Sequence, residues 1–277
     1  MAGRLAIDAM ETLIGQEQRV LDHGFIRLVD YMGGDSAIAQ AARVSYGKGT
    51  KTLREDRNLV RYLMRNGHSS PFEMCEIKLH IKMPLFIARQ WVRHRTASIN
   101  ECSGRYSIME DDFYTPAREQ ICAQSSTNKQ GREGDSLSEA EVQEALLIIR
   151  QNNETAYKYY QKLLNRDDAG EPLRGDYNGI TRELARITLP LNIYTQWYWK
   201  TDLRNLLHFL KLRLHSHAQY EIRLYAQVIA NMVQEWVPQT WEAFKDYVLE
   251  AVTLSQKDYE KSGKDFIFRD TEQDNID

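Results

Sequence analysis

Residues 71–93 read PFEMCEIKLHIKMPLFIARQWVR and contain both kinds of secondary structure from which this chain is built. Apolar and polar residues alternate in part over residues 71–83, where the apolar ones are Phe72, Met74, Ile77, Leu79 and Ile81. This period of two predicts a half-buried strand. Pro84 follows at a position that suits the first turn of a helix, so residues 84–93 are predicted to be helical.

Outward from this stretch, strands are predicted early and helices late. A further strand is predicted over residues 19–32, before the pair Gly33-Gly34. Asp35 suits the N-cap of a following helix. Apolar spacing predicts helices over residues 35–42, 54–65, 139–164, 176–188, 202–237 and 241–254. With no regular βαβ alternation, this order predicts a single α+β domain, with a mixed or antiparallel sheet, long helices and a helix-rich C-terminal half.

The chain is predicted to consist of one domain with three less regular segments. Residues 1–18 are mixed in character and are expected to form a short helix or an arm. Residues 19–254 carry the domain, interrupted at 115–138 by a stretch rich in Gln, Ser, Asn and Gly that we expect to be a surface loop. Residues 255–277 are charged and are predicted to form a frayed tail.

Composition excludes several classes of protein. The chain has 277 residues, 42% hydrophobic and 27% charged, and a formal net charge of −3, which is typical of a soluble globular protein. A dedicated nucleic-acid binder normally has an excess of basic residues. The uncharged stretch 187–199 is too short to span a bilayer. We therefore expect a cytoplasmic protein without a nucleic-acid or membrane partner.

Neither the cysteines nor the histidines predict a metal site. No two of Cys75, Cys102 and Cys122 have C-x-x-C spacing, and an odd number does not form a disulfide framework. On a continuous helix, His208 and His215 face roughly the same way, while His217 points about 200° further round. There is also no G-x-G-x-x-G dinucleotide motif.

The densest polar cluster lies in residues 90–106, which read QWVRHRTASINECSGRY. Guanidinium groups bind phosphate oxygens bidentately, and nearby hydroxyl and amide groups add hydrogen bonds. Gly104 allows the backbone to approach a ligand closely. Two interpretations remain open on these residues alone: a phosphate-ligand site, or a solvated basic helix end. The polar residues concerned are Arg93, His94, Arg95, Ser98, Asn100, Glu101, Ser103 and Arg105.

The cluster resembles the RHRxxSxNxxSxR signature of the flavin-dependent thymidylate synthases. Arg93, Ser98, Asn100, Ser103 and Arg105 are among its seven fixed positions, all at the expected spacing. Further segments resemble the same family in the same order, and the resemblance covers roughly residues 20–250. These segments are residues 42–45, 67–73, 189–192 with Arg186, 212–213 and 216–219.

The resemblance implies a function and an assembly. In this family dUMP is methylated at C5 with methylenetetrahydrofolate as the carbon donor. Reduced FAD supplies the hydride, and NADPH reduces the flavin. The family resemblance further implies a homotetramer on an α+β scaffold, in which FAD and nucleotide lie between subunits. Reactivity then belongs to the cofactor, while the protein binds and orients.

The resemblance also implies roles for individual residues. Arg213 would face the uracil edge and act as the catalytic residue. Asp202 would be repelled by a pyrophosphate, so it would touch adenine or ribose, or nothing. FAD would be contacted by Ser70, Arg93, His94, Arg95, Glu101, Asp202, Arg204 and His208. The dUMP site would comprise Gln90, Arg93, Glu101, Ser103, Gly104, Arg105, Arg186 and Arg213.

Arg204, His208 and Arg213 lie on the helix predicted over residues 202–237. Arg204 and His208 share a helix face, whereas Arg213 lies about 140° round from His208, so one helix would serve two ligand surfaces.

The arginine cluster is also compatible with a non-catalytic nucleotide- or RNA-binding protein. Cys102 is a possible nucleophile, although an inert thiol is the default. Arg213 is also spaced to pair with Glu221, two turns on.

Overall fold

The strands form one antiparallel sheet. The computed structural model describes residues 5–44, 53–125, 132 and 137–262. In the sheet order β1-β2-β3-β5-β4, every neighbouring pair is antiparallel. The predicted α+β class is confirmed. The strands are β1 (Glu17–Val20), β2 (Gly24–Met32), β3 (Glu76–Pro84), β4 (Ser98–Glu101) and β5 (Tyr194–Asp202).

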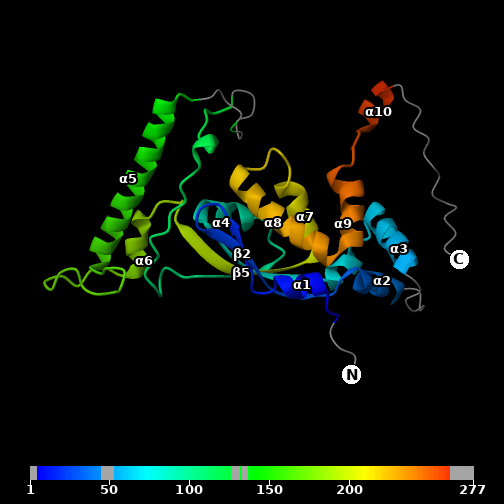
Figure 1. The fold of residues 1–277 in the computed structure, drawn as a ribbon, viewed down its shortest axis with the longest axis horizontal. Coiled ribbons are helices and arrows are strands. Elements are labelled where there is room, and N and C mark those ends of the chain that lie inside the picture. Colours follow the sequence, from blue (N-terminus) through cyan, green and yellow to red (C-terminus); the bar gives the residue numbers. More distant parts are fainter. Residues whose placement is uncertain (1–4, 45–52, 126–131, 133–136, 263–277) are drawn as a thin grey trace.

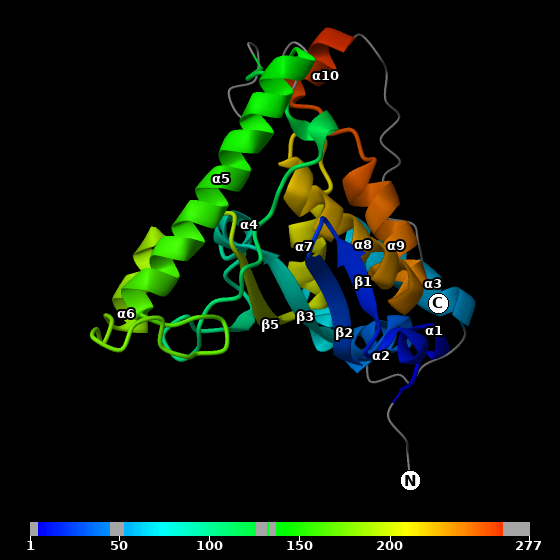
Figure 2. The same ribbon diagram turned by 60° about the vertical axis from the view of Figure 1, so that its left-hand side comes forward.

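Most helices gather on one side of this sheet (Figures 1 and 2). In chain order they are α1 (Asp8–Leu13), α2 (Asp35–Val44), α3 (Leu53–Arg65), α4 (Leu85–Trp91), α5 (Glu139–Leu164), α6 (Arg182–Ala185), α7 (Leu203–Arg213), α8 (Tyr220–Trp236), α9 (Pro238–Phe244) and α10 (Gln256–Ser262). Short 3₁₀ turns lie at Ser70–Met74, Arg118–Gln120 and Arg186–Thr188, and a π-helical turn at Lys245–Leu249. No helix in the described part of the chain is long and apolar enough to cross a membrane.

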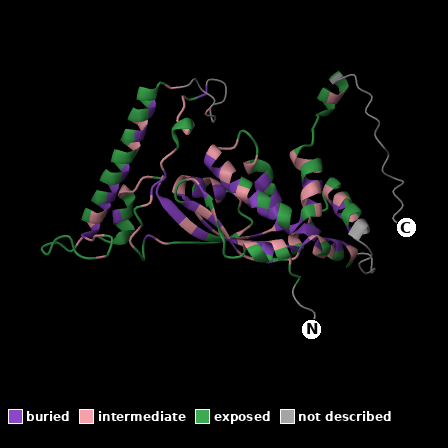
Figure 3. Cartoon of the chain, in the orientation of Figure 1, coloured by how far each residue is buried: buried purple, intermediate pink, exposed green. Residues whose placement is uncertain are grey.

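The main core lies between the sheet and helices α4, α7 and α8. Along β3, Ile77, Leu79, Ile81 and Met83 are buried and alternate with more exposed polar residues. Figure 3 shows buried residues alternating with less buried ones along the strands, and helices that are buried on part of their surface only. The period of two in the sequence therefore predicts correctly which face of β3 packs against helices.

Two strands of the sheet, β4 and β5, were not predicted, and β5 is the longer of them. This strand pairs with β3 on one side and β4 on the other, so it lies inside the sheet although it comes late in the chain. Its buried residues include Trp197, Trp199 and Thr201, at alternate positions. The expectation that strands are confined to the early part is wrong, because β5 joins the sheet by pairing with β3, more than 100 positions earlier in the chain.

Several predicted elements have different boundaries in the structure. The strand over 71–83 begins only at Glu76, after a 3₁₀ turn, and the helix over 241–254 is α9, which starts at Pro238, and a π-helical turn that ends at Leu249. The strand over residues 19–32 is two strands joined by a turn, in which Leu21 has a φ of +60°. The helix over 176–188 is only α6 and the short 3₁₀ turn after it. The helix over 202–237 is interrupted after Arg213. Since α7 and α8 pack against each other, the chain must reverse between them, which one straight helix cannot do.

Asp35 has a different role from the predicted one. The helix α2 begins at Asp35, but its carboxylate accepts hydrogen bonds from the backbone nitrogens of Gln239 (2.8 Å) and Thr240 (3.0 Å). It therefore satisfies donors at the start of α9, 200 residues further along the chain. Burial raises the pKa of this carboxyl above its usual value.

The long helix α5 stands beside the main body (Figure 1). Its start is a capping box in which Ser138 and Glu141 bond reciprocally, as the predicted boundary requires. Its C-terminal half packs on a second small core formed with Phe113, Ala185 and Ile193. The rest of the helix is largely exposed (Figure 3).

The predicted arm, loop and tail fall partly outside the described residues. Within residues 1–18, α1 packs against α8 and buries Met10 in the core. Within 115–138, only residues 115–125, 132, 137 and 138 are described, and within 255–277 only 255–262, which include α10.

Candidate active site

A cationic pocket of about 440 Å³ lies where the end of α4, the strand β5 and the helix α7 meet. Six residues that the sequence assigned to FAD or to catalysis line it together. They are Arg93, His94, Arg95, Arg204, His208 and Arg213. The other lining residues are Thr96, Trp199, Thr201, Asn205 and Leu212. We call this cavity the arginine pocket.

Local contacts hold the walls of the arginine pocket in place. The α4 helix ends at Trp91, whose buried ring anchors the segment that follows. The Oγ1 atom of Thr201 donates to the backbone oxygen of Thr96 (3.0 Å), which ties that segment to β5. Asp202 is the N-cap of α7 and accepts a hydrogen bond from the backbone nitrogen of Asn205 (2.9 Å). The carboxylate of Asp202 therefore has a structural role as a helix cap.

Arg213 and His94 form the closest polar contact in the pocket. The Nε of Arg213 donates to the Nε2 of His94 over 3.0 Å. The His94 ring also packs edge-on against Phe209, with centroids 4.9 Å apart. Burial, followed by the charges of Arg213 and His208, lowers the pKa of His94 to about 4. His94 is therefore neutral near pH 7, and Nε2 accepts the hydrogen bond from Arg213.

The alternative pairing of Arg213 with Glu221 is wrong. Glu221 is fully buried and bonds instead to Arg132 (2.6 Å) and Tyr114 (3.0 Å). Arg213 is the last residue of α7, and its side chain contacts His94 in the segment after α4. Arg204, His208 and Arg213 all line the arginine pocket, so the two ligand surfaces expected of this helix would meet in one cavity.

The lowered pKa of His94 predicts a loss of stability in mild acid. Between about pH 6.5 and pH 4 the unfolded chain binds a proton at His94 that the folded chain does not, so the free energy of unfolding falls as pH falls through this window. Denaturant unfolding at a series of pH values should show a steeper decline for the wild type than for His94→Gln. The exposed His217, changed to Asn, is the matched control and should follow the wild type. Parallel curves for His94→Gln and the wild type would contradict this expectation.

The charge of the arginine pocket favours an anionic ligand. No carboxylate of the described residues lies within 4.0 Å of a guanidinium nitrogen of Arg93, Arg95 or Arg213. The Nε of Arg204, by contrast, lies 3.6 Å from the Oε1 of Glu73. Burial lowers the pKa of Arg213, but a guanidinium stays protonated in proteins. Such a donor set fits the diphosphate of a dinucleotide cofactor such as FAD.

A smaller cavity of about 190 Å³ adjoins the arginine pocket. It shares Arg204 and His208 with that pocket and is also lined by His68 and Ser69. Gly67, with a φ of +68°, ends α3 here, as predicted. Ser70 follows directly in a 3₁₀ turn, but it does not line the cavity.

Of the residues predicted to bind dUMP, Arg93 and Arg213 line the arginine pocket, whereas four others lie near one another outside its lining. Arg105 and Arg186 both contact Glu183. The Nη2 of Arg105 forms an ion pair with the Oε2 of Glu183 (3.5 Å). The Nε of Arg186 donates a hydrogen bond to the backbone oxygen of Glu183 (3.3 Å). Ser103 accepts a hydrogen bond from the backbone nitrogen of Arg105 (3.3 Å). A Cβ on Gly104 would lie 2.8 Å from the Sδ of Met109 and 3.5 Å from Arg186, so glycine lets these side chains approach.

Gln90 and Glu101 are held by other partners. The Nε2 of Gln90 donates to the Oε1 of Gln219, just before α8. Glu101, on β4, accepts from the Oγ1 of Thr195 (2.6 Å). Both contacts depend on residues far along the chain.

Five residues of the pocket wall were not among the predicted site residues: Thr96, Trp199, Thr201, Asn205 and Leu212. Two of them lie on β5. The signal that was available is the run of residues 194–201, which is rich in aromatic and β-branched residues, a composition typical of strands.

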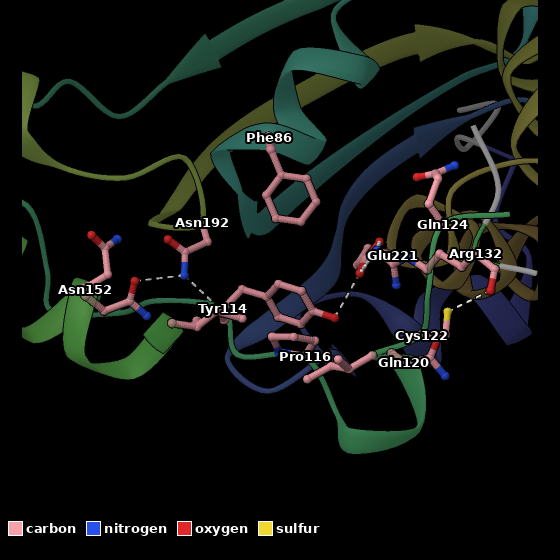
Figure 4. A pocket seen from close by; sticks show the side chains of 13 residues that line it. Phe86, Tyr114, Pro116, Gln120, Cys122, Gln124, Arg132, Asn152, Asn192 and Glu221 are labelled. Carbon is pink, nitrogen blue, oxygen red and sulfur yellow. Dashed lines mark hydrogen bonds and ion pairs between the residues drawn. The ribbon is translucent and has the colours of Figure 1, made fainter. Parts of the chain in front are cut away.

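A second large cavity, of about 460 Å³, contains none of the predicted site residues. It lies between α4, α5 and the segment after residue 113, and Tyr114, Arg132, Asn192 and Glu221 point into it (Figure 4). No group of three or more His, Cys, Asp or Glu side chains in the described part of the chain is arranged to hold a metal ion.

Two comparisons with other sequences agree on the family. The family model described as thymidylate synthase complementing protein (Thy1) matches residues 27–239. The flavin-dependent thymidylate synthase of Rickettsia bellii is 54% identical over 257 residues, which cover 93% of this chain and 87% of the relative. That of Gluconobacter oxydans is 54% identical, covering 92% and 81%.

A solved structure has the same fold. PolB from Streptomyces cacaoi, a UMP/dUMP methylase whose crystal structure contains 5-Br UMP, matches with a TM-score of 0.71 and 31% sequence identity. The match covers 83% of this chain and 97% of PolB. With the signature arginines gathered in one pocket and the family model spanning residues 27–239, this chain belongs to the flavin-dependent thymidylate synthase family.

Proposed function

We propose that this protein converts dUMP to dTMP by reductive methylation, with methylenetetrahydrofolate as the carbon donor and NADPH as the source of reducing equivalents. The observation that carries the proposal is the arginine pocket, in which Arg213 contacts a neutral His94 and, among the described residues, none of Arg93, Arg95 and Arg213 has a carboxylate partner. FAD, when bound and reduced by NADPH, supplies the hydride.

The arginine pocket supplies the groups that would hold FAD. Arg93, Arg95 and Arg204 offer guanidinium forks to the diphosphate. His94 and His208 add ring nitrogens, and Ser70 and Glu101 complete the proposed contacts. Asp202 is engaged as the N-cap of α7, so its part in binding FAD would be to hold that helix and the residues that it carries.

Arg213 would activate the pyrimidine. C5 of uracil must become electron-rich to accept a carbon unit, and loss of the N3 proton places negative charge on the ring. A guanidinium beside N3 and O2 stabilises that anion, and its planar fork matches the planar edge of the base. The bond from its Nε to His94 leaves both terminal nitrogens of Arg213 for the base.

Binding of dUMP would use Gln90, Arg93, Glu101, Ser103, Gly104, Arg105 and Arg186. Because Arg105 and Arg186 do not line the arginine pocket of their own chain, we propose a homotetramer whose subunits complete one another's sites. Exposed apolar side chains support self-association. They include Leu147 and Ile148 on α5, and Leu184, Ile187 and Leu191 around α6.

A spectrum and a turnover assay test this function. The purified protein should bind FAD and show a flavin absorption spectrum. After anaerobic reduction with NADPH, flavin oxidation should depend on both dUMP and methylenetetrahydrofolate, and dTMP should form. A protein that binds dUMP but neither binds flavin nor makes dTMP would be a nucleotide-binding protein, and the proposal would be wrong.

Replacing Arg105 or Arg186 with alanine should weaken dUMP binding more than FAD binding. A charge-assisted hydrogen bond contributes on the order of 1.5–3 kcal/mol, so roughly ten- to hundredfold in affinity is expected. Titrations of each ligand measure this. Equal losses for both ligands would show that the division into a nucleotide group and a flavin group is incorrect.

Cys102→Ala should keep most of the activity. The Sγ of Cys102 is exposed and lies 3.4 Å from the Oγ1 of Thr195. A nucleophilic thiolate needs a nearby base or cation, and none contacts this sulfur among the described residues. A loss of about a thousandfold in turnover with FAD still bound would instead identify Cys102 as a nucleophile.

A further inference from the structure

We propose that Glu221 is a positioning residue that fixes, through Gln219, which end of the Gln90 side-chain amide faces the nucleotide. The inference rests on the proposed function, which places Gln90 at dUMP. Glu221 lies in the first turn of α8, outside the arginine pocket.

The carboxylate of Glu221 is fully buried and surrounded by hydrogen-bond donors. Arg132 donates through one Nη2 to both oxygens (2.6 and 2.8 Å), and the hydroxyl of Tyr114 donates to Oε1 (3.0 Å), as Figure 4 shows. The Nε2 of Gln219 donates to the other oxygen, Oε2 (2.9 Å). The positive charge of Arg132 balances the buried carboxylate.

The chemistry of these groups determines the direction of every bond in the series. A carboxylate only accepts hydrogen bonds, so Gln219 must turn its NH₂ group toward Glu221. Its carbonyl oxygen then faces Gln90, which must turn its own NH₂ group toward Gln219, as the structure shows. Reversing either amide would place two acceptors or two donors face to face.

With one amide N–H given to Gln219, Gln90 keeps its second N–H and its carbonyl oxygen, and that oxygen is the acceptor that it turns toward a ligand. The phosphate and both uracil carbonyls of dUMP are acceptors and gain nothing from this oxygen. Of the two donors on dUMP, the base N3–H lies on the edge proposed for Arg213. The remaining donor is the sugar 3′-hydroxyl, and we assign it to Gln90.

A purely structural role for Glu221 makes different predictions. If Glu221 only ties Arg132 and Tyr114 to α8, its replacement would disturb stability and both ligands alike. If it orients Gln90, the loss would be specific to dUMP and would need an intact Gln219.

The test measures the dissociation constants of dUMP and FAD for four variants of the full chain, with FAD bound during the dUMP titrations. E221Q replaces the carboxylate with an amide that fits Gln219 in either orientation. Q219L interrupts the series and leaves the contacts of Glu221 with Arg132 and Tyr114 intact. The double variant combines them. Y114F is the matched control, because it removes a donor from the same carboxylate but not from the oxygen that Gln219 uses.

Each single change, E221Q or Q219L, should weaken dUMP binding about fivefold, the scale of one net hydrogen bond, and leave FAD affinity within about twofold. The double variant should bind dUMP no more weakly than Q219L alone, since coupled groups are non-additive. Y114F should match the wild type. If E221Q does not fold, Q219L and Q90A, each with the ion pair of Glu221 intact, should show equal, dUMP-specific losses.

Additive losses in the double variant, or equal losses for FAD and dUMP, would overturn the inference. With 2′,3′-dideoxyuridine monophosphate, E221Q should bind as well as the wild type, and a persisting fivefold difference would overturn the assignment of the sugar hydroxyl. If the wild type binds no dUMP, the proposed function fails. If it binds dUMP and E221Q binds it equally well, only the role of Glu221 fails.

Discussion

Arg213→Ala is expected to lower dTMP formation on the order of a thousandfold, the effect of removing a group that stabilises developing charge in a reaction. FAD should stay bound, because Arg93, Arg95, Arg204 and His208 remain in the arginine pocket. NADPH oxidation should stay largely intact, since it does not require the uracil anion. The measurements are dTMP formation at saturating dUMP, NADPH oxidation and the flavin spectrum.

Two further variants test the reason for this effect. Arg213→Lys should recover only part of the activity, because an ammonium lacks the planar fork and cannot bond to His94 and the base in the same geometry. Arg57→Ala is the matched control: it removes the same charge from α3, where Arg57 is exposed and pairs with Glu242. Near-normal dTMP formation by Arg213→Ala would contradict the assignment.

Trp91→Ala is expected to lower the free energy of unfolding by about 3–5 kcal/mol, as for other large-to-small changes in a core. Trp91 is fully buried. Its ring stacks on Phe209 (4.6 Å between centroids) and meets Trp199 and Trp197 edge-on at 5.4 and 6.0 Å. Because Arg93 and His94 follow directly, the cavity left by the alanine should also weaken FAD binding. Denaturant unfolding at constant protein concentration measures the first effect.

Trp91→Phe should be much milder than the alanine variant. The indole nitrogen of Trp91 has no hydrogen-bond partner among the described residues, so phenylalanine removes a buried, unpaired donor while keeping most of the aromatic packing. Equal losses for the phenylalanine and alanine variants would show that the packing described here does not hold α4 in place.

Much of the arginine pocket was predictable from the resemblance to the family signature, but its geometry was not. The signature places Arg93, His94 and Arg95 on three consecutive residues, and all three line the pocket. That Arg213 bonds to His94 follows only from the packing of α7 against the core, because the two residues are 119 positions apart. The lowered pKa of His94 arises from that burial and proximity, which no local pattern contains.

Local sequence alone determined the helices whose ends carry their own signals. The helix α5 begins at the Ser138–Glu141 capping box, and α3 is followed by Gly67 in a conformation that favours glycine. These signals act within a few residues, so they can be recognised without the rest of the chain.

Only the tertiary structure decided the position of β5, the break between α7 and α8, and the partners of Glu221. A strand is stable only when its backbone groups pair with neighbouring strands, and β5 finds them in β3 and β4, distant in sequence. Likewise, the charge of Glu221 is balanced by Arg132, 89 residues earlier, rather than by the helically spaced Arg213. Burial selects these pairings, because a buried carboxylate or backbone group is stable only beside a complementary partner, wherever in the sequence that partner lies.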